Sequence, residues 1–341
     1  MPGTNTTPPV APNGRLLRPL RLAIFGASLV SDYGNPLATT ARAVMQALTE
    51  RGHEVTFLEE RRNAPTVALL RERGAAPLRA FSARYPRLRY RTYEMPPGIE
   101  GALWLSRELA TIDAVILHEG TPPAIIELLT GRSGRHFVRV AHAAGGGQPL
   151  LPDADLVISA LPEGSTQSVP FGPAVMPQPH SPEQRTDVLL VGYDDMDVAQ
   201  AARSALSEAG VTVTTIASGI APLPDWPFVP EAELPARYGA ARLAIVVGIG
   251  TDPLAAARAL LPVAAGCPVI VVGDAPRRDF GSAVKVATID SLPAQVAEAL
   301  VSAELQIAVP SAFDATEQAE RLVGAIARRL PALAFGSPSN N

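Results

Sequence analysis

The chain has 341 residues, of which 47% are hydrophobic and 18% are charged, so it can form large hydrophobic cores. This length exceeds that of one ordinary compact domain and favours two. A formal net charge of −4 lacks the basic surplus that attracts nucleic acid or an anionic membrane, and no apolar run of about eighteen residues predicts a membrane-spanning helix. We therefore expect no nucleic-acid partner and no membrane span.

The start of the chain and its single cysteine bear on its location. Residues 1–18 carry Pro, Thr and Asn where a signal peptide needs an apolar segment, so we interpret them as a disordered leader and expect a cytoplasmic protein. Cys267 alone excludes an internal disulfide and a cysteine-based metal cluster. It lies in the stretch AAGCPVIVV, which favours a buried, small hydrophobic side chain. We predict no metal site.

The first half of the chain alternates apolar strands with amphipathic helices. The run RLAIFGA, residues 21–27, is typical of a parallel strand that is covered on both faces. A helix is predicted over 36–52, with a proline at its start and a glycine at its end. Further strands are predicted at 53–60, 113–120, 136–143 and 154–160. This βαβ pattern predicts a doubly wound sheet over residues 19–160.

A stretch rich in Pro, Gly, Ser and Gln, residues 161–186, interrupts the pattern and predicts an interdomain linker. A second α/β domain is predicted over 187–308, and a C-terminal helix and tail over 309–341. The strands of the second domain are predicted at 187–193, 211–218, 243–250 and 268–274, and its helices at 197–210, 253–266 and 291–305. The fold class expected is therefore α/β, with two Rossmann-like domains facing a cleft that is the default ligand site.

Four segments carry a resemblance to a known family. They are SDYGNPLATTARAVMQALTERGHEVTFLEE, VPFGPAV, VPEAELPARYGAARLAIVV and RALLPVAAGCPVIVVGD. Together they resemble GT-B glycosyltransferases of the family-4 type and the CgeB-like spore-maturation group, over residues 19 to about 305. The resemblance implies transfer of a sugar from a nucleotide-sugar donor, held by the second domain, to a glycan or small acceptor held by the first. It implies no cofactor and no metal, and it leaves open a protein partner or a homo-oligomer.

The loop after the first predicted strand is the candidate acceptor site. Gly26 allows a tight exit from the strand, and free N–H groups at the start of the next helix favour an anion or a sugar hydroxyl. The alternative is an ordinary solvated loop. The candidate acceptor-binding residues of this loop are Ser28, Ser31, Asp32, Tyr33, Gly34 and Asn35.

Two histidines follow predicted strands, where ligand sites of α/β folds gather. The His118 imidazole could accept the proton of an acceptor hydroxyl, and Glu119 is the alternative base, so both are catalytic candidates. His142, which precedes three glycines, is a further acceptor-binding candidate. A structural role in the core is the alternative for each histidine.

The second domain carries the candidate donor-binding residues, which are Gly192, Tyr193, Gly248, Thr251, Asp252 and Arg258. In the resembled families a basic pair follows the first strand of this domain, whereas here the sequence offers Asp194, Asp195 and Asp197. Carboxylates would repel a diphosphate unless a cation intervened. Acidic residues also stabilise the first turn of a helix, and we favour this explanation.

The resemblance also fails at one donor-site position. Leu261 stands where the family has a glutamate that binds the ribose, and leucine cannot accept those hydrogen bonds. Arg258, three residues earlier, is expected either to meet a phosphate or to be a surface arginine.

These substitutions leave several functions open. A divergent glycosyltransferase is the first hypothesis, and a catalytically inactive GT-B module that binds a sugar or supports a catalytic partner is the second. A sugar-nucleotide epimerase of the same fold would need cleft carboxylates, of which Glu119 is one. A nicotinamide-dependent enzyme is disfavoured because no G-x-G-x-x-G follows the first strand.

Overall fold

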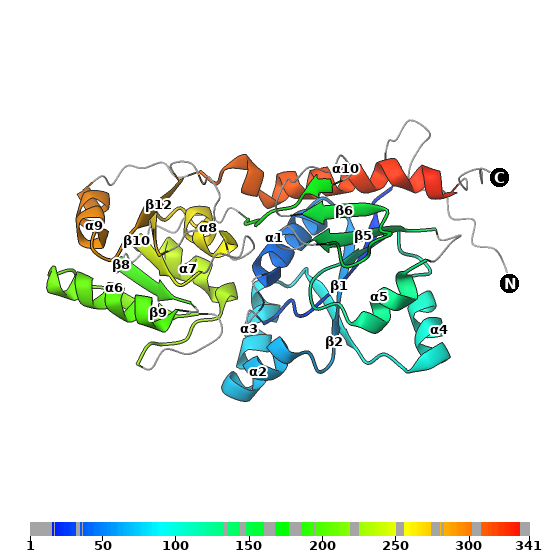
Figure 1. Cartoon of the computed structure of the whole chain (residues 1–341), viewed down its shortest axis with the longest axis horizontal. Helices are drawn as coiled ribbons and strands as arrows, with labels where there is room; N and C mark the ends of the chain where they lie inside the picture. The colour runs from blue at the N-terminus through cyan, green and yellow to red at the C-terminus, as the bar shows by residue number, and fades with distance from the viewer. Residues whose placement is uncertain are drawn as a thin grey trace.

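The computed structural model places two parallel β-sheets side by side along the long axis of the molecule (Figure 1). It describes residues 16, 18–31, 35, 37–131, 136–143, 148–159, 168–176, 186–193, 195–218, 225–249, 256–273, 280, 283–301 and 308–334. Buried apolar clusters lie on both faces of each sheet. The predicted α/β fold with two Rossmann-like lobes is confirmed.

The N-terminal lobe has, in its described part, a seven-stranded sheet in which every neighbouring pair is parallel. Its strands are, in spatial order, β3 (Arg89–Tyr93), β2 (Glu54–Glu60), β1 (Arg21–Gly26), β4 (Ala114–Leu117), β5 (Val138–Ala143), β6 (Leu156–Ser159) and β7 (Ser168–Pro170). The helices between them are α1 (Leu37–Glu50), α2 (Ala64–Arg73), α3 (Ala76–Arg84), α4 (Gly98–Glu108) and α5 (Pro123–Leu129).

The central strand of this lobe is buried on both faces, as its continuous apolar sequence predicts. Leu22 and Ile24 of β1 belong to one core cluster, whereas Ala23 and Phe25 belong to the cluster on the other face. Successive side chains of a strand point to opposite faces, so a strand between two helix layers is apolar at every position.

The C-terminal lobe repeats this design with a smaller sheet, again parallel at each described pairing. Its strands are, in spatial order, β12 (Val284–Ala287), β11 (Val269–Val272), β10 (Ala241–Val247), β8 (Thr186–Gly192) and β9 (Thr214–Ala217). Its helical segments are α6 (Met196–Glu208), the 3₁₀ turn η2 (Glu231–Glu233), α7 (Leu234–Gly239), α8 (Ala256–Ala264) and α9 (Leu292–Val301). Cys267 is buried in the core of this lobe, as predicted.

The end of the chain returns to the N-terminal lobe. After the short turn η4 (Ser311–Phe313), the helix α10 (Ala315–Ala334) packs along α1 (Figure 1). Leu322 and Ile326 are fully buried in the cluster that also contains Ile24 of β1. The predicted C-terminal amphipathic helix therefore completes the core of the first lobe.

The two ends of the predicted first domain differ in detail from the expectation. Strand β7 lies within the range predicted as linker and adds an edge strand to the first sheet. Most of the predicted leader lies outside the described residues, but Arg18 forms a bidentate ion pair with Asp113, with both N–O distances at 2.9 Å. In the described part of the chain, no helix combines the length and the apolar character needed to cross a membrane.

Candidate functional site

Both sheets have a switch point, where the strand order reverses, and several candidate residues lie there. In the first lobe the reversal falls between β1 and β4, and His118 follows β4 directly. In the second lobe the reversal falls between β8 and β10. Tyr193 follows β8 directly, and Gly248 follows β10 directly. Open α/β sheets bind ligands outside the carboxyl ends of their strands at this point. The topology therefore supports two facing halves of one site.

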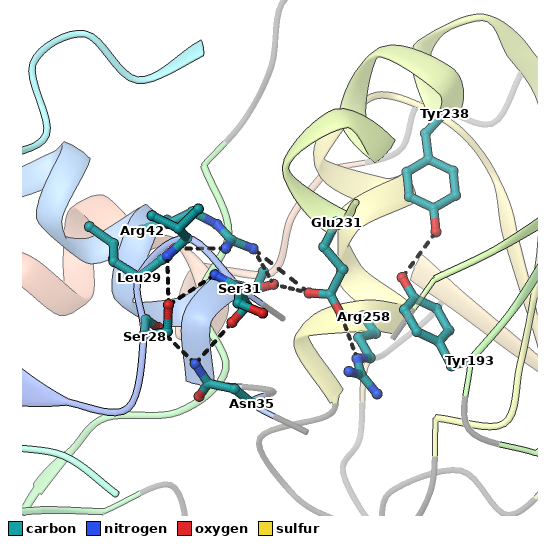
Figure 2. Close-up of polar contacts among 11 residues, drawn as sticks. Ser28, Leu29, Ser31, Asn35, Arg42, Tyr193, Glu231, Tyr238 and Arg258 are labelled. Atoms are coloured by element: carbon teal, nitrogen blue, oxygen red, sulfur yellow. Dashed lines mark hydrogen bonds and ion pairs between the residues drawn. The ribbon is translucent and has the colours of Figure 1, made fainter. Parts of the chain in front are cut away.

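The loop between β1 and α1 uses its polar groups to hold its own shape. The Ser28 hydroxyl accepts hydrogen bonds from the backbone N–H groups of Val30 and Ser31, at 3.2 and 3.0 Å. The Asn35 amide donates to the carbonyls of Ser28 and Ser31, at 2.7 and 3.2 Å (Figure 2). The Ser31 hydroxyl donates to the Pro65 carbonyl at 2.7 Å. These candidates thus shape the loop, whereas Asp32, Tyr33 and Gly34 lie outside the described residues.

A buried carboxylate at the end of β2 anchors the same loop. Glu59 accepts a hydrogen bond from the Leu29 N–H at 3.1 Å, and Ser28 is in turn bonded to the Thr66 hydroxyl at 2.9 Å. Burial raises the pKa of Glu59, and its hydrogen bonds to neighbouring donors oppose that rise. The described part of the loop is therefore anchored to the end of β2 and to α2.

The two candidate histidines lie against each other in the first lobe. His118 and His142 are 3% and 0% exposed, and their ring centroids are 5.1 Å apart, with Phe171 packed against both. Burial lowers the pKa of His142 to about 4 and that of His118 well below its usual value, the latter with a smaller contribution from His142. Both rings are thus neutral at neutral pH. Glu119, the alternative base, is exposed.

The acidic turn after β8 caps a helix in its described part. The Asp195 side chain accepts the Val198 N–H at 3.0 Å as the N-cap of α6, and Asp197 lies in the first turn. The helix-start explanation is confirmed for these two residues, and Asp194 lies outside the described residues. Gly192 closes β8 by pairing with Val247 of β10.

Arg258 is not a surface arginine, so that alternative is wrong. It is 1% exposed, and its guanidinium lies 4.6 Å from the centroid of the Tyr193 ring. Its Nε donates to the Glu231 carboxylate at 2.7 Å (Figure 2). The Tyr193 hydroxyl lies 3.5 Å from that of Tyr238, and burial raises the pKa of both phenols. A protein carboxylate therefore holds the arginine expected to meet a phosphate.

Glu231 is the principal site residue that the sequence prediction missed. It lies in the segment VPEAELPARY, which is part of the resemblance, but the sequence predicts no site residue there. The carboxylate contacts the other lobe as well, because it accepts a hydrogen bond from Thr39 and lies 3.8 Å from the guanidinium of Arg42 (Figure 2). Both partners belong to α1. Only the tertiary structure reveals this contact between lobes.

The remaining donor candidates give a mixed picture. Leu261 is buried in the core of the second lobe and lines a small interlobe cavity together with Glu231, whose carboxylate is held by Arg258. Gly248 lies at the switch point with a φ of +73°. Thr251 and Asp252 lie outside the described residues.

These features define a protein with the GT-B fold, in which two Rossmann-like lobes face each other. The solved structures that resemble it include an alpha-glucosyltransferase in complex with UDP and a 13-mer DNA containing a HMU base. That chain has a TM-score of 0.52 and 11% identity, over 91% of this chain and 95% of its own. The same type of enzyme in complex with UDP-glucose and DNA containing an abasic site gives a TM-score of 0.52 and 11% identity, over 92% and 96%. MurG of Acinetobacter baumannii gives 0.42 and 15%, over 93% and 100%.

The similarity is one of fold. No family model matches the chain, and no curated protein matches it in sequence.

Proposed function

We propose that this protein is a glycosyltransferase-like enzyme that transfers a sugar from a nucleotide-sugar donor to an as yet unidentified acceptor. The observation that carries the proposal is the pair of facing switch points in a GT-B fold, shared over more than nine-tenths of both chains with an alpha-glucosyltransferase. The resemblance to family-4-type and CgeB-like sequences supports the same class. A cytoplasmic location and the absence of a cofactor belong to this proposal.

In the proposed reaction, an acceptor hydroxyl bonds to the anomeric carbon while the bond from that carbon to the nucleotide diphosphate breaks. A base takes the hydroxyl proton, and positive groups stabilise the leaving diphosphate. His118 is neutral and could take the proton, although its lowered pKa makes it a weak base. Glu119 is exposed beside it and is the second candidate for this role.

UDP-sugars are the first donors to test, because the similar alpha-glucosyltransferase was solved with UDP and with UDP-glucose. The DNA bound in those two structures is not carried over to this protein, since the net charge of −4 gives no attraction for nucleic acid.

Two observations favour a second candidate, a catalytically inactive GT-B module. Arg258 is bound by Glu231, and Leu261 stands where the resembled families have a ribose-binding glutamate. Both features reduce the number of side chains in the second lobe that are able to bind the phosphates or the ribose of a nucleotide. A module of this kind would bind a sugar or support a catalytic partner without turnover.

Thermal unfolding with UDP-, GDP- and dTDP-sugars tests the proposal. A donor at ten times its Kd stabilises the folded state by about 1.4 kcal/mol and raises Tm.

Turnover assays of two variants test which residue is the base. His118→Gln should abolish turnover while the chain stays folded, whereas Glu119→Gln should leave the enzyme active. The opposite pattern would assign the base to Glu119. An unchanged Tm at millimolar concentrations of all three donors would favour the inactive module.

A further inference from the structure

Polar side chains from both lobes converge on one carboxylate at the lobe interface. Thr39 and Arg42 lie in the first turns of α1, and Arg258 lies near the start of the described part of α8. Thr39 donates a hydrogen bond to Glu231 of the turn η2, and Arg42 and Arg258 point toward the same carboxylate (Figure 2). Each lobe therefore contributes part of the environment of this carboxylate.

The two oxygens of the carboxylate have partners in different lobes. Oε1 accepts the Nε–H of Arg258 in its own lobe at 2.7 Å. Oε2 accepts the Thr39 hydroxyl and lies 3.8 Å from a guanidinium nitrogen of Arg42, both in the other lobe. The side chain of Glu231 is fully buried, and those of Arg42 and Arg258 are 4% and 2% exposed. A carboxylate removed from water is tolerated only with such partners.

This cluster is connected to both switch points. Arg42 donates to the Leu29 carbonyl at 3.0 Å, in the loop that follows β1. On the other side, the Arg258 guanidinium packs over the ring of Tyr193, which follows β8. The candidate acceptor loop and the candidate donor residues are therefore joined through Glu231.

A small cavity lies beside the cluster at the lobe interface. A cavity of about 30 Å³, roughly the volume of one water molecule, lies against Thr39, Arg42 and Glu231. Gln46 and Tyr85 line this cavity and also a groove of about 220 Å³ at the surface. A small void thus borders the buried carboxylate at the lobe interface.

We infer that Glu231 is an interlobe latch, which together with Thr39, Arg42 and Arg258 holds the two lobes in their present relative orientation, and whose release lets that orientation change. The latch follows from the interface itself and does not depend on what the protein binds. Its consequence for substrates, a coupling between the acceptor loop and the donor residues, rests on the proposed function.

The test compares Glu231→Gln with Glu233→Gln, an exposed glutamate of the same turn. Glutamine keeps the shape of the side chain but removes the charge that holds two guanidinium groups. We expect Glu231→Gln to increase the radius of gyration in small-angle X-ray scattering. We also expect hydrogen exchange at the start of α1 to become about tenfold faster, while Glu233→Gln matches the unmodified protein. Equal behaviour of the two variants would overturn the latch.

If Glu231→Gln does not fold, a second pair of variants with smaller changes tests the latch. Thr39→Val removes only the hydroxyl that donates to Glu231, whereas Thr49→Val removes a hydroxyl of the same helix that bonds to the Met45 carbonyl. The latch requires faster exchange in α8 and η2 for Thr39→Val alone, and the same response in both variants would exclude it. Neither readout involves a nucleotide, so failure of the latch and failure of the proposed function are distinguishable.

Discussion

At the scale of single residues, the histidine pair is the most unusual buried group of the first lobe. Within the described part of the chain, Nδ1 of His118 and both ring nitrogens of His142 have no hydrogen-bond partner. Most buried polar atoms in native proteins are paired, because an unpaired one keeps its desolvation cost. The pair therefore lowers the stability of the fold.

The same burial predicts a pH dependence. The pKa of His142 falls from 6.5 in the unfolded chain to about 4 in the folded one, so between these values the unfolded chain binds more protons. Stability is full above pH 6.5 and is lost as the pH falls toward 4, by about 3 kcal/mol for this histidine. We expect His142→Leu to unfold at an equal or higher urea concentration at pH 7 and to lose less stability on acidification.

Urea unfolding at intervals from pH 7 to pH 4.5 checks this expectation. An unchanged slope of the free energy of unfolding against pH in His142→Leu would show that the acid sensitivity arises elsewhere.

At the scale of elements, the second lobe brings two strand-to-helix turns into direct contact. A Cβ atom added to Gly248 would lie 2.6 Å from the backbone nitrogen of Asp195, the N-cap of α6. The φ of +73° at this glycine also disfavours any other residue. The glycine therefore allows the turns after β8 and β10 to meet at the switch point.

We predict that Gly248→Ala destabilises the protein more than Gly210→Ala. Gly210 has a similar φ of +76° but no atom within 4 Å of an added Cβ, so it incurs only the backbone cost of about 1–2 kcal/mol. Gly248→Ala must in addition displace the start of α6. Urea unfolding of both variants measures the difference, and equal losses would mean that the contact with Asp195 is easily relaxed.

At the scale of the whole molecule, the helix α10 follows the second lobe in sequence but packs against the first lobe. The chain leaves the first lobe after β7, forms the second, and returns so that α10 covers α1 (Figure 1). Since Leu322 is fully buried in the core of the first lobe, that lobe cannot complete its core until α10 has been synthesised.

We therefore expect Leu322→Ala to cost about 2–5 kcal/mol, the range for emptying a packed leucine site. Arg328→Ala, at an exposed position of the same helix, should change stability by no more than about 0.5 kcal/mol. Calorimetry checks both values and shows which lobe responds. A loss confined to the second lobe would contradict the assignment of α10 to the first.

The sequence alone determined the two-lobed α/β fold, because its signals are local. The apolar runs of β1 and β8, and the amphipathic pattern of α10, depend on neighbours a few residues away. No element is predicted from the sequence in residues 61–112, and α2, which lies in this range, has only Thr66 and Leu69 buried.

Only the tertiary structure decided what lies at the lobe interface. Thr39 and Glu231 are 192 positions apart, and neither carries a motif that announces their contact. Whether Arg258 faces solvent, a phosphate or a carboxylate depends on how α8, η2 and the residue after β8 pack within the second lobe. The physical reason is that charge pairing and burial are set by the atoms that surround a side chain after folding, and sequence periodicity reports only which face of its own element that side chain occupies.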